Sequence, residues 1–138
     1  MTVRETVQET LDRLLLPHGI LSHHLKRVEA DQIGDGSIPI NNDEYCVFRI
    51  VSSRQGSFGD GRSQLVRSYI DINYYYTYEK TDVRFTDAEA RIGSIIKEFL
   101  KDPRFRIANG QSDLYDADSV FRGINVEFLF FEAVSGDE

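Results

Sequence analysis

Apolar residues recur every three to four positions in two segments of the 138-residue chain, and this spacing predicts two helices. Near the N-terminus, Thr2 and Glu5 match a capping box, and the apolar stripe that follows continues to Leu16, where a proline and a glycine come soon after. A second stripe follows a similar match, TDAE, and runs to KDPRF, where proline disfavours further helix. The sequence therefore predicts an N-terminal helix and a central helix over about 86–100.

Two segments instead have the β-prone composition of strands. Residues 45–52, YCVFRIVS, lack glycine and proline, and residues 65–78 alternate between a mostly apolar and a mostly polar face. The second segment includes the tyrosine-rich run YIDINYYYTY. Its period of two predicts that Tyr74, Tyr76 and Tyr78 pack on the central helix while Tyr75 faces outward.

The rest of the chain completes an α+β pattern. After the central helix we expect a short strand over 105–108, a turn-rich segment NGQSDLYDADS and a long apolar strand over 120–133. Glycines predict an extended hairpin tip at 53–64, and an irregular connection precedes the first strand; residues 134–138 form a frayed tail. The predicted fold is a single domain, residues 1–138, in which a mostly antiparallel sheet of about four strands from two hairpins is packed by the N-terminal and central helices.

Composition and charge limit the classes of function. With 41% hydrophobic and 28% charged residues, the chain has the composition of a folded domain, and no stretch approaches the roughly 18 apolar residues that span a bilayer. The net charge of −7 disfavours nucleic-acid binding, because an acidic surface repels phosphates. Cys46 is the only cysteine, so no intramolecular disulfide can form. We therefore predict a protein without specific nucleic-acid or membrane binding.

No motif in the sequence supports catalysis, a cofactor or a metal site. The three histidines lie between the N-terminal helix and the first predicted strand, but Cys46 is the only thiol that could join them as a zinc ligand. The segment from Asp31 departs from a calcium loop, since Ile33 and Asn42 occupy ligand positions. The glycines of the hairpin tip are followed by a strand, whereas a phosphate-binding loop requires a helix. We predict that the protein is not an enzyme and uses no cofactor or metal.

Two regions are candidates for contacts with other proteins. In the hairpin tip, Phe58 lies between Arg54 and Arg62 and is a candidate docking anchor; the alternative is that Phe58 folds back onto the sheet. In the last strand, large apolar residues occupy both alternating sets of positions, so one set can cover the helices while the other meets a partner. The outward candidates are Tyr75, Phe121, Leu129 and Phe131.

The features occur in a characteristic order: an amphipathic helix, a β-prone hairpin with a long glycine-rich tip, a helix opened by FTDAEARIGSIIKEFL, a turn-rich NGQSDLYDAD and a closing strand FRGINVEFLFF that contains Arg122, Gly123 and Ile124. In this order they resemble the tail terminator and tail-to-head joining (tail completion) proteins of long-tailed bacteriophages. The resemblance covers most of the chain and rests on element order rather than on a catalytic motif.

The resemblance implies a structural protein of the tail-head junction of a virion, present in the host cytoplasm during assembly. Its identical subunits would form a ring, expected to be a hexamer, that caps the tail tube, stops its growth and joins it to the head. The implied partners are further copies of the chain, tail-tube proteins and head-connector proteins. An acidic lumen would let DNA pass with little adhesion.

Two other classes of function remain open. A small-ligand or partner-binding module would use the tyrosine-rich sheet as the floor of a pocket beneath Tyr74 and Tyr76. A regulatory protein would bind its partner as a monomer. A closed ring differs from both because each subunit needs two different complementary surfaces.

Overall fold

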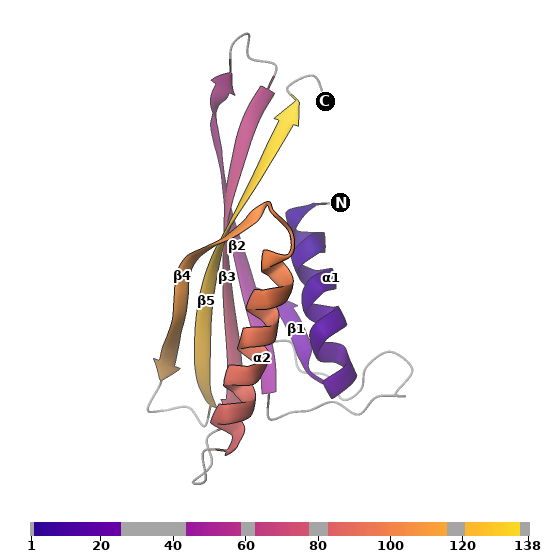
Figure 1. Ribbon diagram of the computed structural model, residues 1–138, viewed down its shortest axis with the longest axis vertical. Helices are drawn as coiled ribbons and strands as arrows, with labels where there is room; N and C mark the ends of the chain where they lie inside the picture. Colours follow the sequence, from indigo (N-terminus) through magenta and orange to yellow (C-terminus); the bar gives the residue numbers. More distant parts are fainter. Residues whose placement is uncertain (1, 26–43, 59–62, 78–82, 116–120, 136–138) are drawn as a thin grey trace.

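The computed structural model describes residues 2–25, 44–58, 63–77, 83–115 and 121–135 of the chain. These residues form two α-helices, a short 3-10 helix (Leu16–His18) and five strands. In chain order the main elements are α1 (Val3–Leu15), β1 (Leu21–His24), β2 (Glu44–Phe58), β3 (Ser63–Thr77), α2 (Val83–Leu100), β4 (Phe105–Tyr115) and β5 (Phe121–Ser135) (Figure 1). The predicted α+β class is confirmed.

One five-stranded sheet, with the order β1-β2-β3-β5-β4, forms the body of the fold. β2 pairs antiparallel with β3, β4 pairs antiparallel with β5, and β3 joins these two hairpins by antiparallel pairing with β5. The prediction of about four antiparallel strands is therefore incomplete, because β1 adds a fifth strand that is parallel to β2. β1 has only four residues, LSHH, too few for an alternation of apolar and polar positions to be recognised.

Both helices end where the sequence predicts, but α2 begins earlier than predicted. At the start of α1, the backbone N–H of Glu5 donates to the hydroxyl of Thr2 at 3.2 Å, so the predicted cap is present. α2 starts at Val83, which places Thr86 inside the helix rather than at its cap. No glycine or proline separates these two residues, so the helix extends by about one turn.

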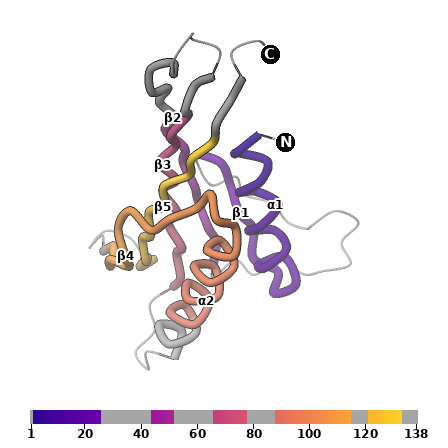
Figure 2. The backbone as a smooth tube through the Cα atoms, turned by 45° about the horizontal axis from the view of Figure 1, so that its top comes forward, coloured from indigo at the N-terminus to yellow at the C-terminus, as the bar shows by residue number. Residues whose placement is uncertain are grey.

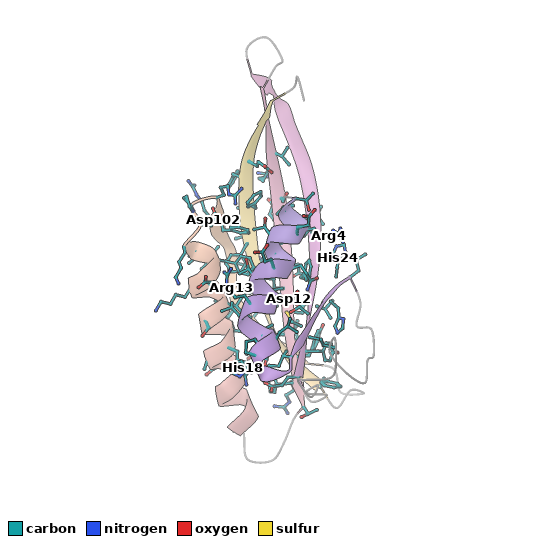
Figure 3. All side chains as sticks on the ribbon, turned by 90° about the vertical axis from the view of Figure 1, so that its right-hand side faces the viewer. Arg4, Asp12, Arg13, His18, His24 and Asp102 are labelled. Carbon is teal, nitrogen blue, oxygen red and sulfur yellow. The ribbon has the colours of Figure 1, made fainter. Side chains whose placement is uncertain are left out.

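The core lies between the sheet and a layer made by α1 and α2, which pack on the same face (Figure 2). Side chains from the even-numbered positions of β2, β3 and β5 point into this core, where they meet the helix side chains shown in Figure 3. Tyr74 is fully buried and Tyr76 is 4% exposed, which confirms that they pack toward the helices. Tyr78 lies outside the described residues.

β2, β3 and β5 each span 15 residues and continue beyond the ends of both helices (Figure 1). In the region predicted as a hairpin tip, Arg54 pairs with Val66 and Phe58 pairs with Ser63, with a β-bulge after Arg54. β5 pairs with the same extension up to Ser135, and residues 136–138 lie outside the described residues. The strands therefore form a paired three-stranded arm at this end of the sheet.

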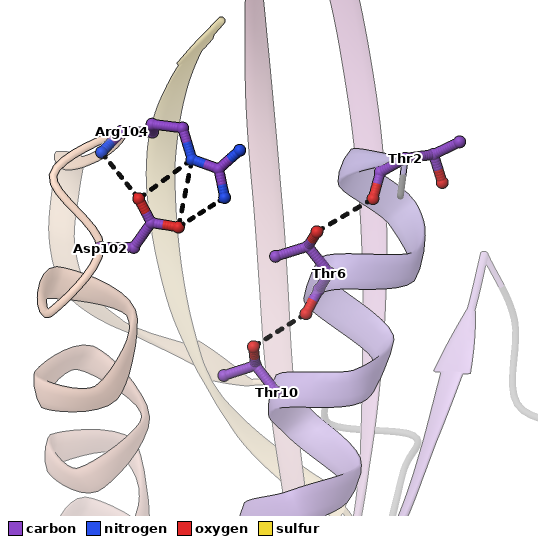
Figure 4. Close-up of polar contacts among 5 residues, drawn as sticks. All are labelled: Thr2, Thr6, Thr10, Asp102 and Arg104. Atoms are coloured by element: carbon purple, nitrogen blue, oxygen red, sulfur yellow. Dashed lines mark hydrogen bonds and ion pairs between the residues drawn. The ribbon is translucent and has the colours of Figure 1, made fainter.

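β4 occupies most of the segment that the sequence predicts to be turn-rich. Its register with β5 shifts after Ile107 and again after Asn109. Such bulges leave extra residues out of the ladder, so a turn-prone segment can still pair. The turn before β4 is fixed by the carboxylate of Asp102, which accepts hydrogen bonds from the backbone N–H and the guanidinium of Arg104 (Figure 4).

Candidate interaction surface

The second face of the sheet, here called the open face, lies on the side away from α1 and α2. Because both helices pack on the even-numbered positions, the odd-numbered positions of β2, β3 and β5 point to the other side. The register of β4 adds Arg106, Asn109 and Leu114 to this face. Among the described residues, neither helix covers the open face.

Aromatic side chains gather at one end of the open face. Tyr45 stacks on Tyr75 with ring centroids 4.9 Å apart and meets Phe121 edge-on at 5.1 Å. The Tyr75 ring also crosses Gly123, where an added Cβ would come within 3.0 Å of that ring and 3.2 Å of Leu114. Glycine leaves the room that the ring needs. Burial raises the pKa of the Tyr75 hydroxyl.

A polar cluster occupies the centre of the open face. The amide nitrogen of Asn125 donates to the carboxylate of Asp71 and, at 2.7 Å, to the side-chain oxygen of Asn73. The guanidinium of Arg49 lies 3.6 Å from the same Asp71 carboxylate. These groups satisfy one another, so the centre of the face is polar without requiring an outside ligand.

Arginines and exposed apolar side chains form the other end, here called the basic end: Val51, Arg67, Tyr69, Arg106 and Phe131. The guanidinium carbon of Arg67 lies 5.4 Å from the centre of the Tyr69 ring, and that of Arg106 lies 5.7 Å from the centre of the Phe131 ring. Val51 is 54% exposed and Tyr69 is 41% exposed. The Nε of Arg67 is buried without a hydrogen-bond partner among the described residues.

The outward residues predicted from the sequence lie on the open face. Tyr75 and Phe121 belong to the aromatic end, whereas Leu129 and Phe131 lie at or beside the basic end. Their contacts with a partner remain predictions. Of the three candidates in the hairpin tip, Arg54 and Phe58 belong to β2, where only their backbone is described. Arg62 lies outside the described residues.

The sequence did not single out as contact candidates five further residues at the two ends of the open face: Tyr45, Val51, Arg67, Tyr69 and Arg106. The signal for the first four was present, because the period of two in β2 and β3 assigns odd positions to one side. Arg106 gave no such signal, since its place depends on the register of β4 with β5.

A buried polar network ties the sheet to α2 on the covered face. The hydroxyl of Tyr74 donates to Oε1 of Glu44 at 2.6 Å, and Nε of Arg91 lies 3.4 Å from the same oxygen. Glu44 is 7% exposed, so these two groups replace much of the water that a carboxylate needs. Burial, reinforced by Glu44, raises the pKa of the Tyr74 hydroxyl. The network joins β2, β3 and α2 and uses the phenol as a neutral donor.

Cys46 is fully buried, and burial raises the pKa of its thiol to about 12. A thiol that stays protonated at neutral pH is a poor nucleophile. Nearby, the side-chain amide of Gln8 donates to Asp12 at 3.0 Å and to the carbonyl of Ser22 at 3.2 Å, which links α1 to β1. These polar groups hold the first helix against the edge of the sheet.

A groove of about 410 Å³ lies between the end of α1 and α2, lined by Leu14, Leu15, His18, Ala90, Arg91 and Ser94. Its only described guanidinium, that of Arg91, is already engaged with Glu44. Within the described parts of the chain, no three histidine, cysteine, aspartate or glutamate side chains converge as a metal site would require. Neither described helix is long and apolar enough to span a membrane.

No known protein-family model matches the chain, and no curated protein matches it. The geometry of the open face and the order of the elements are therefore the basis for assigning a function.

Proposed function

We propose that the protein is a structural subunit of a long-tailed bacteriophage, and that identical copies form a ring that caps the tail tube and joins it to the head. The phage assignment follows from the resemblance in element order. The assembly role is carried by one observation, the open face, where large apolar side chains such as Val51 and Tyr69 are exposed. Covering such groups with another protein removes apolar surface from water and is favourable.

The open face suits a flat protein partner better than a small ligand. Ligand sites are concave and converge on a few polar groups, whereas the aromatic end is filled by its own stacked rings and the polar centre is internally satisfied. A pocket beneath Tyr74 and Tyr76 would need accessible side chains, but both are buried in the core. This burial argues against the ligand-binding alternative.

The three-stranded arm and the charge of the chain agree with a ring at the tail-head junction of the virion. The arm extends past the helix layer, so it can reach a neighbouring subunit, the tail tube or a head-connector protein (Figure 1). The net charge of −7 would let DNA pass through the ring without adhering. By the resemblance the ring is a hexamer, and it needs neither a cofactor nor an active site.

Deletion of the gene from the phage that encodes the protein tests this function. We expect filled heads and unjoined tails of irregular length in electron micrographs, and recovery of joined particles when the wild-type chain is supplied. Normal joined virions without the protein would overturn the proposal. Light scattering at several concentrations, with and without purified tail tubes, measures ring formation directly.

A further inference from the structure

We propose that the copies associate head to tail, with an acidic strip on α1 of one copy bound to the basic end of the open face of the next. The acidic strip consists of Glu5 and Glu9, two exposed carboxylates one turn apart on the helix. This inference rests on the proposed ring and deepens it, because it names the two different surfaces that a heterologous contact requires.

The acidic strip forms one row on the outer side of α1. Glu5 and Glu9 are four positions apart and both exposed, so they lie on one side of the helix, away from the buried Leu11. Asp12 follows them but is half-buried and accepts a hydrogen bond from Gln8. Like charges four positions apart destabilise a helix, so an opposing cation would relieve a cost that the lone subunit carries.

The basic side chains nearest the strip do not neutralise it fully. Arg13 turns toward α2 and pairs with Glu98 at 2.9 Å. Arg4 lies beside the first turn of the helix and is exposed (Figure 3). The two carboxylates of the strip therefore share one arginine, Arg4, that no ion pair among the described residues engages, and the strip stays acidic.

The basic end offers the complementary charge. Among the described residues, neither Arg67 nor Arg106 forms an ion pair, whereas Arg49 is engaged with Asp71. Each of the two unpaired guanidinium groups is held near an aromatic ring, which limits the entropy lost when it binds a carboxylate. A carboxylate from a neighbouring copy would form charge-assisted hydrogen bonds with either guanidinium group.

The two surfaces lie at the same level along the strands. Thr6 and Thr10 of α1 share a depression with Asp102 and Phe105, and Figure 4 shows these helix turns beside the Asp102 turn. Phe105 pairs with Phe130, whose neighbour in the chain, Phe131, belongs to the basic end. Copies rotated about an axis parallel to the strands could therefore join strip to basic end without sliding along that axis. A closed ring requires such a rotation without translation, whereas a translation would give a helical filament.

The strip and the basic end also lie on opposite sides of the subunit. The strip belongs to the helix layer, and the basic end belongs to the sheet face that the described helices leave uncovered. One copy can then present its strip to one neighbour and its basic end to another, as each member of a ring must.

Charge reversal tests the contact. We would compare the wild-type chain with a basic-end variant (Arg67→Glu/Arg106→Glu), a strip variant (Glu5→Lys/Glu9→Lys) and the control Lys97→Glu, an exposed reversal on α2. Sedimentation velocity would measure association of each protein, and thermal unfolding would verify that each variant folds. If the double strip variant does not fold, Glu9→Lys alone replaces it, because the acidic Glu5 stabilises the first turn of α1.

The head-to-tail contact predicts a specific pattern of loss and rescue. The basic-end and strip variants should each associate about tenfold more weakly or worse, while the control stays near wild type. An equal mixture of the two variants should recover association, because the intact strip of one meets the intact basic end of the other. Added salt should weaken association of the wild type, since the contact is electrostatic.

Several results would overturn the inference. These are variants that associate as the wild type does, a mixture without recovery, and a wild-type chain that stays monomeric with and without tail tubes. Binding of a labelled single-stranded oligonucleotide that is lost in the basic-end variant would instead identify nucleic acid as the partner. If the charge-reversal experiment fails but gene deletion still prevents head-tail joining, only the head-to-tail contact is wrong. If heads and tails join normally after gene deletion, the proposed function is wrong.

Discussion

Gly123 allows an aromatic side chain to cross a strand on the open face. The Tyr75 ring lies against the backbone of β5 at this position and is held on its other side by Tyr45. In the proposed assembly, this stacked end is part of the surface that a neighbouring copy would cover.

Replacing Gly123 with alanine is expected to lower the free energy of unfolding by about 1–3 kcal/mol. The new Cβ would lie 3.0 Å from the Tyr75 ring and 3.2 Å from Leu114, so the stacked ring must shift. Urea unfolding followed by tyrosine fluorescence measures the change. Gly110→Ala on β4 is the matched control, because a Cβ there meets nothing within 4 Å. Equal losses in the two variants would contradict the steric explanation.

Cys46 should make the protein less stable in alkali. Its pKa is about 12 in the folded chain against an ordinary value of 9.0, so the unfolded chain releases the thiol proton first as pH rises. The folded state then holds more protons, and the free energy of unfolding falls with pH by up to about 1.4 kcal/mol per unit. This contribution is complete below pH 9.0 and is lost progressively between 9.0 and about 12.

Chemical unfolding of the wild type and of Cys46→Ala, from about pH 8 to about pH 10, checks this sign. The slope of stability with pH should be shallower in the variant, even if the variant is less stable throughout because of a cavity. Parallel slopes would show that other groups cause the alkaline loss.

At the scale of elements, the sequence predicted those whose periodic pattern is long. The stripe of α1 and the alternation of β3 repeat over several turns or pairs, so their faces could be assigned from spacing alone. β1 is too short to repeat, and β4 carries turn-prone residues through two register shifts. These two edge strands exist because β2 and β5 offer them partners, and a local pattern does not encode such tertiary pairing.

For the open face too, the sequence predicted only the residues whose side follows from alternation within one strand. Tyr75 and Phe121 follow from alternation within their own strands. Arg106 reaches the basic end only through the pairing of β4 with β5, and its proximity to Phe131 is a product of register. Of the two arginines at the basic end, only Arg67 could therefore be assigned to this face from the sequence.

The network of Tyr74, Glu44 and Arg91 couples two strands to α2, and Tyr74→Phe tests that coupling. Loss of the hydroxyl leaves a carboxylate that is 7% exposed with one hydrogen bond fewer. We expect a loss of about 1–3 kcal/mol in the free energy of unfolding. Tyr69→Phe is the control, because Tyr69 is 41% exposed on the open face and its change should be small.

A double-mutant cycle isolates the interaction from the loss of packing. In a Glu44→Gln background, Tyr74→Phe should cost less than in the wild type, because the neutral amide is a weaker acceptor than the carboxylate. The same cost in both backgrounds would show that the hydrogen bond does not stabilise the fold.

At the scale of the whole molecule, the two layers have different surfaces. The helix layer buries the core and presents the acidic strip, whereas the sheet presents apolar groups among arginines on its open face. A chain with net charge −7 repels its own copies at long range, so association needs local patches that overcome this repulsion. In the proposed assembly the exposed apolar groups of the open face supply such a patch. A substitution of one of these apolar groups tests the position of the patch, whereas the charge reversals above test its charge.

Val51→Asp and Ile107→Asp form a matched pair for this test. Both residues are large, apolar and about half exposed, at 54% and 44%, but Val51 lies on the open face and Ile107 pairs with Phe128 on the covered side. If the open face is the contact surface, Val51→Asp should weaken association by about tenfold or more, because a carboxylate would be buried at the interface. Ile107→Asp should leave association within about threefold of wild type.

Light scattering over a concentration series, with urea unfolding of each variant, separates association from folding. Both aspartates sit at exposed strand positions, so the two variants should lose similar stability as subunits and differ only in assembly. Equal weakening by both substitutions would show that the loss of association does not depend on the open face. Unchanged association in Val51→Asp would remove the open face from the interface, because a carboxylate added at the basic end would repel the acidic strip of the neighbouring copy and compete with it for the arginines.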